Sequence, residues 1–236
     1  MKKECEFAIF NFEEQDGKLI DDLCEFIDKN AQKVYDFFEI KKKEKATINI
    51  IPTKAEYDAF YIKKYNLKAD QKVPKWAIGS RADDGQIYYV SLFDYKNTSH
   101  AYEEKDFEAA LVRYKKTCLH EFVHFVNLKY QQEKGCGRTE TWLSEGLAVY
   151  LSGQKEDKEI EGFPFTLQQL MPQENFGSCY DGWYMLVKYL VENYPKQKIF
   201  ELIESNRQAR EFLKDELFEK VRKYFNNLEN KKTTWN

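Results

Sequence analysis

The spacing of apolar residues in the first hundred positions predicts both a helix and strands. Over residues 18–40 apolar side chains recur every three or four positions, which predicts an amphipathic helix. Residues 46–51 (ATINII) are rich in β-branched side chains and are followed by Pro52, so we expect a strand there. A second strand is expected over residues 86–95, with its turn supplied by Asp83-Asp84-Gly85.

Helical spacing dominates the rest of the chain. Thr53 can cap a helix that runs to Tyr65, because Glu56 three positions later completes a capping-box pattern. Further helices are expected over about 104–132, 140–152 and 180–194, with one or two between 196 and 229. We therefore expect an α+β fold in a single domain over 1–236, with a mixed α/β part over 1–100 and a helical part over 101–236.

Charge and cysteine content narrow the class of protein. The chain has 37 Lys and Arg against 40 Asp and Glu, a net charge of −3, so nucleic acid is not an expected partner. No apolar run is long enough for a membrane span, and the amino terminus does not resemble a secretory signal. Five scattered cysteines predict reduced thiols in a cytoplasmic protein, although a secreted protein without its leader would show the same pattern. The oligomeric state stays open.

The clearest chemical signal is the segment His120-Glu121-Phe122-Val123-His124. Residues four apart on a helix point the same way, so both imidazoles can bind one ion, with Glu121 turned toward a water on that ion. This helix is apolar around most of its circumference, and polar side chains inside such a helix need partners. A Zn²⁺ ion would supply one.

A third ligand is expected from the next helix. Catalytic zinc keeps three protein ligands and leaves a fourth position for water. Glu145 is the one carboxylate within the apolar stretch 141–151, which makes it the natural third ligand. Gly135 and Gly137 in the intervening loop allow the chain to reverse between the two helices.

The sequence lacks the residues that two other kinds of metal site would require. A di-iron site using Glu121 and His124 would need a second Glu-x-x-His, and His100 has Asn97 at the required position. The metzincin pattern would need Gly and His soon after His124, and residues 127–132 contain neither. His100 lies in a polar segment and is expected to be a solvent-exposed loop residue.

HEFVH followed by WLSEGLAVYL resembles the gluzincin zinc metallopeptidases, the thermolysin and zinc-aminopeptidase clan, and in particular its short peptidase-MA-like domains. Twenty residues separate His124 from Glu145, close to the separation usual in that group. The resemblance implies Zn²⁺ bound by His120, His124 and Glu145, Glu121 as general base, and a peptide or protein substrate. The implied activity is zinc-dependent peptide-bond hydrolysis.

The same resemblance implies a further catalytic residue. In the aminopeptidase branch a tyrosine that opens a downstream helix donates a hydrogen bond to the oxyanion, and Tyr180 occupies the matching place. Tyr184 is the nearby alternative. A purely packing role for Tyr180 also stays open.

Two segments bear on how a peptide would be held. Residues 86–92, with 76–79 before them, resemble the strand at the edge of the sheet on which this clan holds the substrate backbone. The aminopeptidase motif Gly-x-Met-Glu-Asn is replaced by Gly85-Gln86-Ile87-Tyr88-Tyr89, which favours an endopeptidase or a specialised processing peptidase. The alternative is a catalytically silent zincin-like domain that acts as a partner-binding module.

Overall fold

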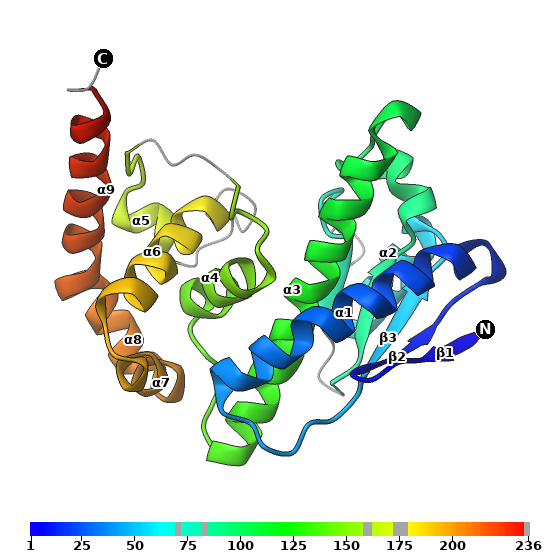
Figure 1. Ribbon diagram of the computed structural model, residues 1–236, viewed down its shortest axis with the longest axis horizontal. Helices are drawn as coiled ribbons and strands as arrows, with labels where there is room; N and C mark the ends of the chain where they lie inside the picture. The colour runs from blue at the N-terminus through cyan, green and yellow to red at the C-terminus, as the bar shows by residue number, and fades with distance from the viewer. Residues whose placement is uncertain (69–71, 82–84, 158–161, 172–178, 234–236) are drawn as a thin grey trace. The chain divides into compact units, whose positions relative to one another are not determined.

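The structure is a computed structural model that describes residues 1–236 apart from 69–71, 82–84, 158–161, 172–178 and 234–236 (Figure 1). The expected turn residues Asp83 and Asp84 lie outside the described residues. The chain divides into two compact units, Met1–Lys129 and Tyr130–Asn236. Strands occur in the first unit and the second is helical, so the fold is α+β as expected.

The first unit is built on a five-stranded sheet with the strand order β1-β2-β3-β5-β4. Its strands are β1 (Lys2–Glu4), β2 (Ala8–Asn11), β3 (Ala46–Ile51), β4 (Gly79–Arg81) and β5 (Ile87–Val90). β2, β3 and β5 run parallel, whereas β1 and β4 pair antiparallel at the two edges. Parallel neighbours need crossover connections, and these contain helices α1 (Gly17–Phe38) and α2 (Lys54–Tyr65).

Helix α3 (Phe107–Lys134) packs on the sheet through aromatic rings. The ring of Tyr89 on β5 lies 4.5 Å from that of Tyr114 on α3, centroid to centroid. Helix α1 joins the same core, since Tyr35 meets Phe122 of α3 edge to face at 5.8 Å. All four rings are fully buried, and the core of the first unit therefore fixes α3 against the sheet.

The predicted helix over 18–40, the strand over 46–51 and the helix from Thr53 are confirmed. Thr53 Oγ1 accepts a hydrogen bond from the Glu56 amide at 3.2 Å. The strand expected over 86–95 is shorter, because β5 ends at Val90 and a 3₁₀ helix, η2 (Leu92–Asn97), follows.

The sequence did not predict β1, β2 or β4, which have only three or four residues each. The interpretation of residues 86–92 as the edge strand was wrong. β5 lies between β3 and β4, and the edge position belongs to β4. β4 has only three residues, which is too short to show an alternating pattern of apolar and polar side chains. For this reason the sequence favours a loop at residues 79–81.

The regular elements in the described residues of the second unit are helices. They are α4 (Thr141–Ser152), α5 (Leu167–Leu170), α6 (Tyr180–Asn193), α7 (Lys196–Glu204), α8 (Asn206–Phe212), a π-helical turn η5 (Leu213–Leu217) and α9 (Phe218–Thr233). α4 and α6 approach closely at Gly146, where an added Cβ would lie 2.6 Å from the backbone oxygen of Trp183. Only glycine permits this approach, so Gly146 sets the packing of the helix that carries Glu145.

The start of α4 is anchored by polar contacts. Gln131 Nε2 donates to Thr139 Oγ1 at 2.7 Å, and Arg210 on α8 contacts the carboxylate of Glu140 at 2.7 Å. Glu140 is 5% exposed, and its charge also lies at the helix amino terminus, where the helix dipole favours an anion. These contacts fix where α4 begins, four residues before Glu145.

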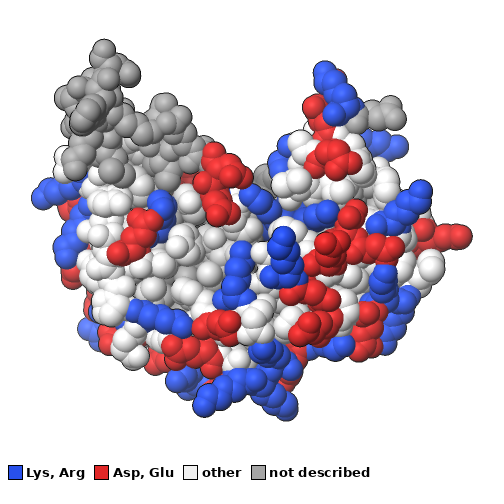
Figure 2. Space-filling model, in the orientation of Figure 1, with Lys and Arg blue, Asp and Glu red and all other residues white. Residues whose placement is uncertain are grey.

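Three properties expected from the sequence concern the charge of the surface, the length of apolar helices and the state of the cysteines. Basic and acidic side chains are interspersed on the face shown in Figure 2. Among the described residues, no helix has both the length and the apolar character needed to cross a bilayer. All five cysteines are free thiols.

Candidate metal centre

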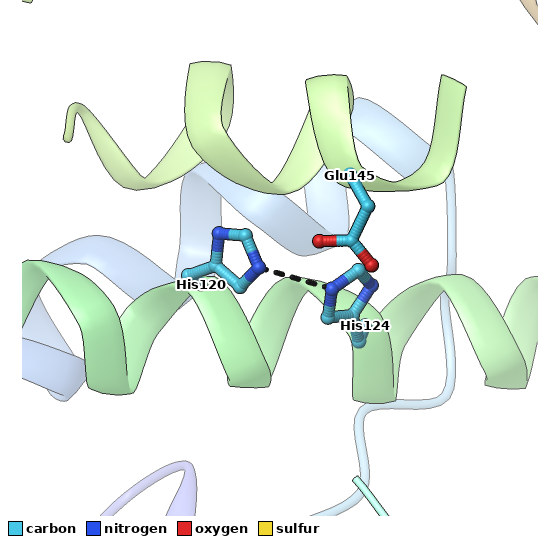
Figure 3. Close-up of side chains that lie close together, drawn as sticks. All are labelled: His120, His124 and Glu145. Carbon is cyan, nitrogen blue, oxygen red and sulfur yellow. Dashed lines mark hydrogen bonds between the residues drawn. The ribbon is translucent and has the colours of Figure 1, made fainter. Parts of the chain in front are cut away.

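Helix α3 brings the two histidines of the HExxH segment together. The Nε2 atoms of His120 and His124 lie 3.1 Å apart, and the ring planes are inclined by 81° (Figure 3). Two ligands about 2.05 Å from a tetrahedral zinc ion would be about 3.3 Å apart. The two imidazoles on this helix therefore lie at a separation that suits one ion.

Glu145 on α4 completes the group. Figure 3 shows its carboxylate beside the two imidazoles. His120, His124 and Glu145 each offer one ligand atom, and these atoms lie within 4.8 Å of one another. His120 is buried, and the other two are half-buried. The three residues form a group that could hold a metal ion.

The donor types restrict which ion this would be. Two imidazole nitrogens and a carboxylate oxygen suit borderline transition metals, zinc among them, better than calcium or magnesium, which prefer oxygen. Cysteine is absent from the group. Cys118, two residues before His120 on the same helix, is fully buried, and burial raises the pKa of its thiol, which disfavours the thiolate.

Glu121 lies against the edge strand. A Cβ added at Gly79 on β4 would be 3.0 Å from Glu121 Oε1 and 2.8 Å from Cδ2 of Tyr89. Glu121 is only 8% exposed, so its carboxylate occupies a confined space beneath the backbone of β4. The sequence did not predict this contact. Its one signal was an isolated glycine after Ile78, since a glycine in a strand can mark a close approach of other groups.

His100 lies outside this group, as expected. It is exposed, and its Nε2 is 3.2 Å from the backbone oxygen of Trp76. Because a carbonyl accepts, His100 donates this hydrogen bond through Nε2. It lies in the loop after η2.

Tyr180 is the first residue of α6, as the sequence predicted. It is half-buried, and its ring meets Trp183 edge to face at 5.4 Å. Tyr184, one turn later, is 7% exposed, and burial raises the pKa of its phenol. Of the two tyrosines, Tyr180 has the more accessible side chain.

Comparison with family models, with curated proteins and with solved structures found no match to this chain.

The metal centre can be tested by titration. Replacing His124 or Glu145 by alanine should lower zinc affinity by more than about 100-fold, since loss of even an outer-shell partner costs 10–100-fold. Competition with a chromophoric chelator measures this affinity. His100→Ala is the matched control and should bind zinc as the unaltered chain does. Equal affinity in all three variants would rule out the group.

The confined space at Gly79 gives a second prediction. Gly79→Ala should lower the free energy of unfolding by about 1–3 kcal/mol, because the new methyl group must displace Tyr89 or Glu121. Urea denaturation measures the change. Gly137→Ala is the control, since a Cβ there meets nothing within 4 Å. Equal stability of the two variants would contradict the close contact.

Proposed function

We propose that this chain is a zinc-dependent peptidase of the gluzincin type, acting as an endopeptidase or specialised processing peptidase. The observation that carries the proposal is the His120, His124 and Glu145 group, with Glu121 next to the first histidine. A structural zinc site is usually closed by four protein ligands, whereas a catalytic site has three. This set of three favours catalysis over a bracing role.

The metal and the base would divide the chemistry between them. A bound zinc ion supplies Lewis acidity, which makes a coordinated water more acidic and a carbonyl more electrophilic. Glu121 removes the proton from the attacking water as the C–O bond forms. It then returns that proton to the amine nitrogen as the C–N bond breaks, so the carboxylate ends each turnover unchanged.

The confinement of Glu121 supports its role as base. Its carboxylate is held between helix α3 and the backbone of β4 at Gly79, which limits the positions that it can adopt. A general base must sit within hydrogen-bond reach of the proton that it removes, and a restricted side chain meets this requirement with little loss of entropy.

Tyr180 is proposed as the donor to the oxyanion. Peptide-bond hydrolysis passes through a tetrahedral intermediate, whose negative oxygen is stabilised by a fixed hydrogen-bond donor. Two observations support Tyr180 in this role: it is the first residue of α6, and its side chain is only half-buried, so the phenol is accessible to a ligand. The phenol would donate its proton in a hydrogen bond and keep it throughout.

The sheet edge supports a peptide substrate. Among the described strands, β4 pairs only with β5, which leaves the outer edge of β4 for an extended backbone. The segment that replaces the aminopeptidase motif, Gly85 to Tyr89, belongs to the turn before β5 and to β5 itself, within the sheet. It carries no glutamate for a substrate amino group, which supports endopeptidase or processing action.

The base is tested by Glu121→Gln. The amide cannot accept and return a proton, so peptide cleavage should fall by about 10²–10⁴-fold while zinc stays bound. Casein cleavage and elemental analysis measure the two effects. Glu108→Gln, an exposed position on the same helix, is the control and should keep full activity. Full turnover by Glu121→Gln would refute the assignment.

The oxyanion donor is tested by Tyr180→Phe. Loss of one donor to the oxyanion should lower kcat by about 10²–10³-fold with little change in KM. Steady-state kinetics on one peptide would measure both constants. Tyr189→Phe on the same helix is the control, and Tyr184→Phe tests the alternative. A loss confined to Tyr184→Phe would transfer the role to that residue.

A further inference from the structure

Helix α2 carries a row of tyrosines that leads from the interior to the surface. Tyr57, Tyr61 and Tyr65 are spaced four residues apart, so they lie on one face of the helix. Neighbouring ring centroids are 5.9 Å and 4.4 Å apart. Tyr57 is fully buried, Tyr61 is half-buried and Tyr65 is 37% exposed. The outer part of the row therefore presents aromatic surface to a ligand.

Helix α2 packs on the strand pair that borders Glu121. Phe60 stacks on Tyr88 of β5 with ring centroids 4.1 Å apart. Tyr88 is paired with Ser80 of β4, and side chains directly opposite in a strand pair lie on the same side. The preceding residue of β4, Gly79, faces the other side of the sheet, where a Cβ would lie 3.0 Å from Glu121 Oε1. The tyrosine row and the proposed catalytic base therefore flank β4 from opposite faces, at adjacent residues of the strand.

Electrostatics agree with that placement. Burial is the main cause that raises the pKa of Tyr57 and of Tyr61, and the negative charge of Glu121 raises both further. The carboxylate and the two phenols are therefore close enough to interact.

The inner end of the row holds two hydroxyl groups without a hydrogen bond. Within the described part of the chain, Tyr57 Oη and Ser80 Oγ are buried and have no partner of hydrogen-bond geometry. The Ser80 hydroxyl also lies beside the Tyr57 phenol and lowers its pKa, against the rise that burial causes. Buried polar groups are normally satisfied, so this pair suits a ligand that brings its own polar atoms.

We propose that Tyr61 and Tyr65 form the side wall of the substrate site and select peptides with an aromatic residue near the cleaved bond. The inference deepens the proposed peptidase function and rests on it. An extended peptide along β4 would direct every second side chain to the side of Ser80, which is the side that α2 covers. There an aromatic side chain can stack on the exposed rings, while the peptide backbone can reach the hydroxyls of Tyr57 and Ser80.

The test is the cleavage preference of the zinc-loaded full chain. Casein cleavage sites mapped by mass spectrometry should be enriched in aromatic residues within three positions of the cut. Two peptides that differ only by Phe or Ala at the enriched position should then differ about tenfold in kcat/KM. Tyr61→Ala should abolish that ratio, whereas Tyr61→Phe, which keeps the ring, should retain it. Phe93→Ala, a 45% exposed ring outside the row, is the matched control and should also retain it.

Circular dichroism checks that each variant is folded. If Tyr61→Ala does not fold, the same ratio of kcat/KM values is measured with Tyr65→Ala instead. Cleavage without aromatic preference, or a preference that survives both alanine variants, overturns the tyrosine wall and leaves the peptidase proposal intact. A zinc-loaded chain that cleaves no peptide overturns both proposals.

Discussion

Everything proposed for this chain depends on two imidazoles held on one face of one helix. The four-residue spacing of His120 and His124 on helix α3 places their Nε2 atoms 3.1 Å apart. Helix α3 is fixed in turn by buried aromatic rings, Tyr89 and Tyr114 among them. A rigid helix with this spacing loses little freedom when it binds an ion, which is the physical basis of a preformed metal centre.

Glycines adapt each unit to its functional side chains. Gly79 lets the edge strand lie against Glu121, and Gly146 lets α6 lie against the helix that carries Glu145. At Gly79 an added Cβ would meet the side chains of Tyr89 and Glu121, and at Gly146 it would meet the backbone of Trp183. The space beside the proposed base and the approach of α6 to α4 thus depend on the absence of a methyl group, which is a constraint of packing rather than of charge.

The sequence predicted the parts of this arrangement that depend on local spacing. Helical periodicity and the capping residue Thr53 gave the main helices, and the HExxH pattern with Glu145 gave the metal group. The short strands and the contact of Gly79 with Glu121 were missed, because they depend on residues that are distant in sequence. Pairing across a sheet edge leaves almost no trace in three residues, whereas a helix of 28 residues leaves a strong one.

The central claim concerns the atoms around the metal, so X-ray absorption at the zinc edge of the purified, zinc-loaded chain tests it most directly. The account predicts scattering from nitrogen and oxygen at about 2.0–2.2 Å, with an imidazole signature equivalent to two histidines and no sulfur. A sulfur shell at about 2.3 Å, or a first shell without imidazole, would contradict it, because either result would place the ion elsewhere.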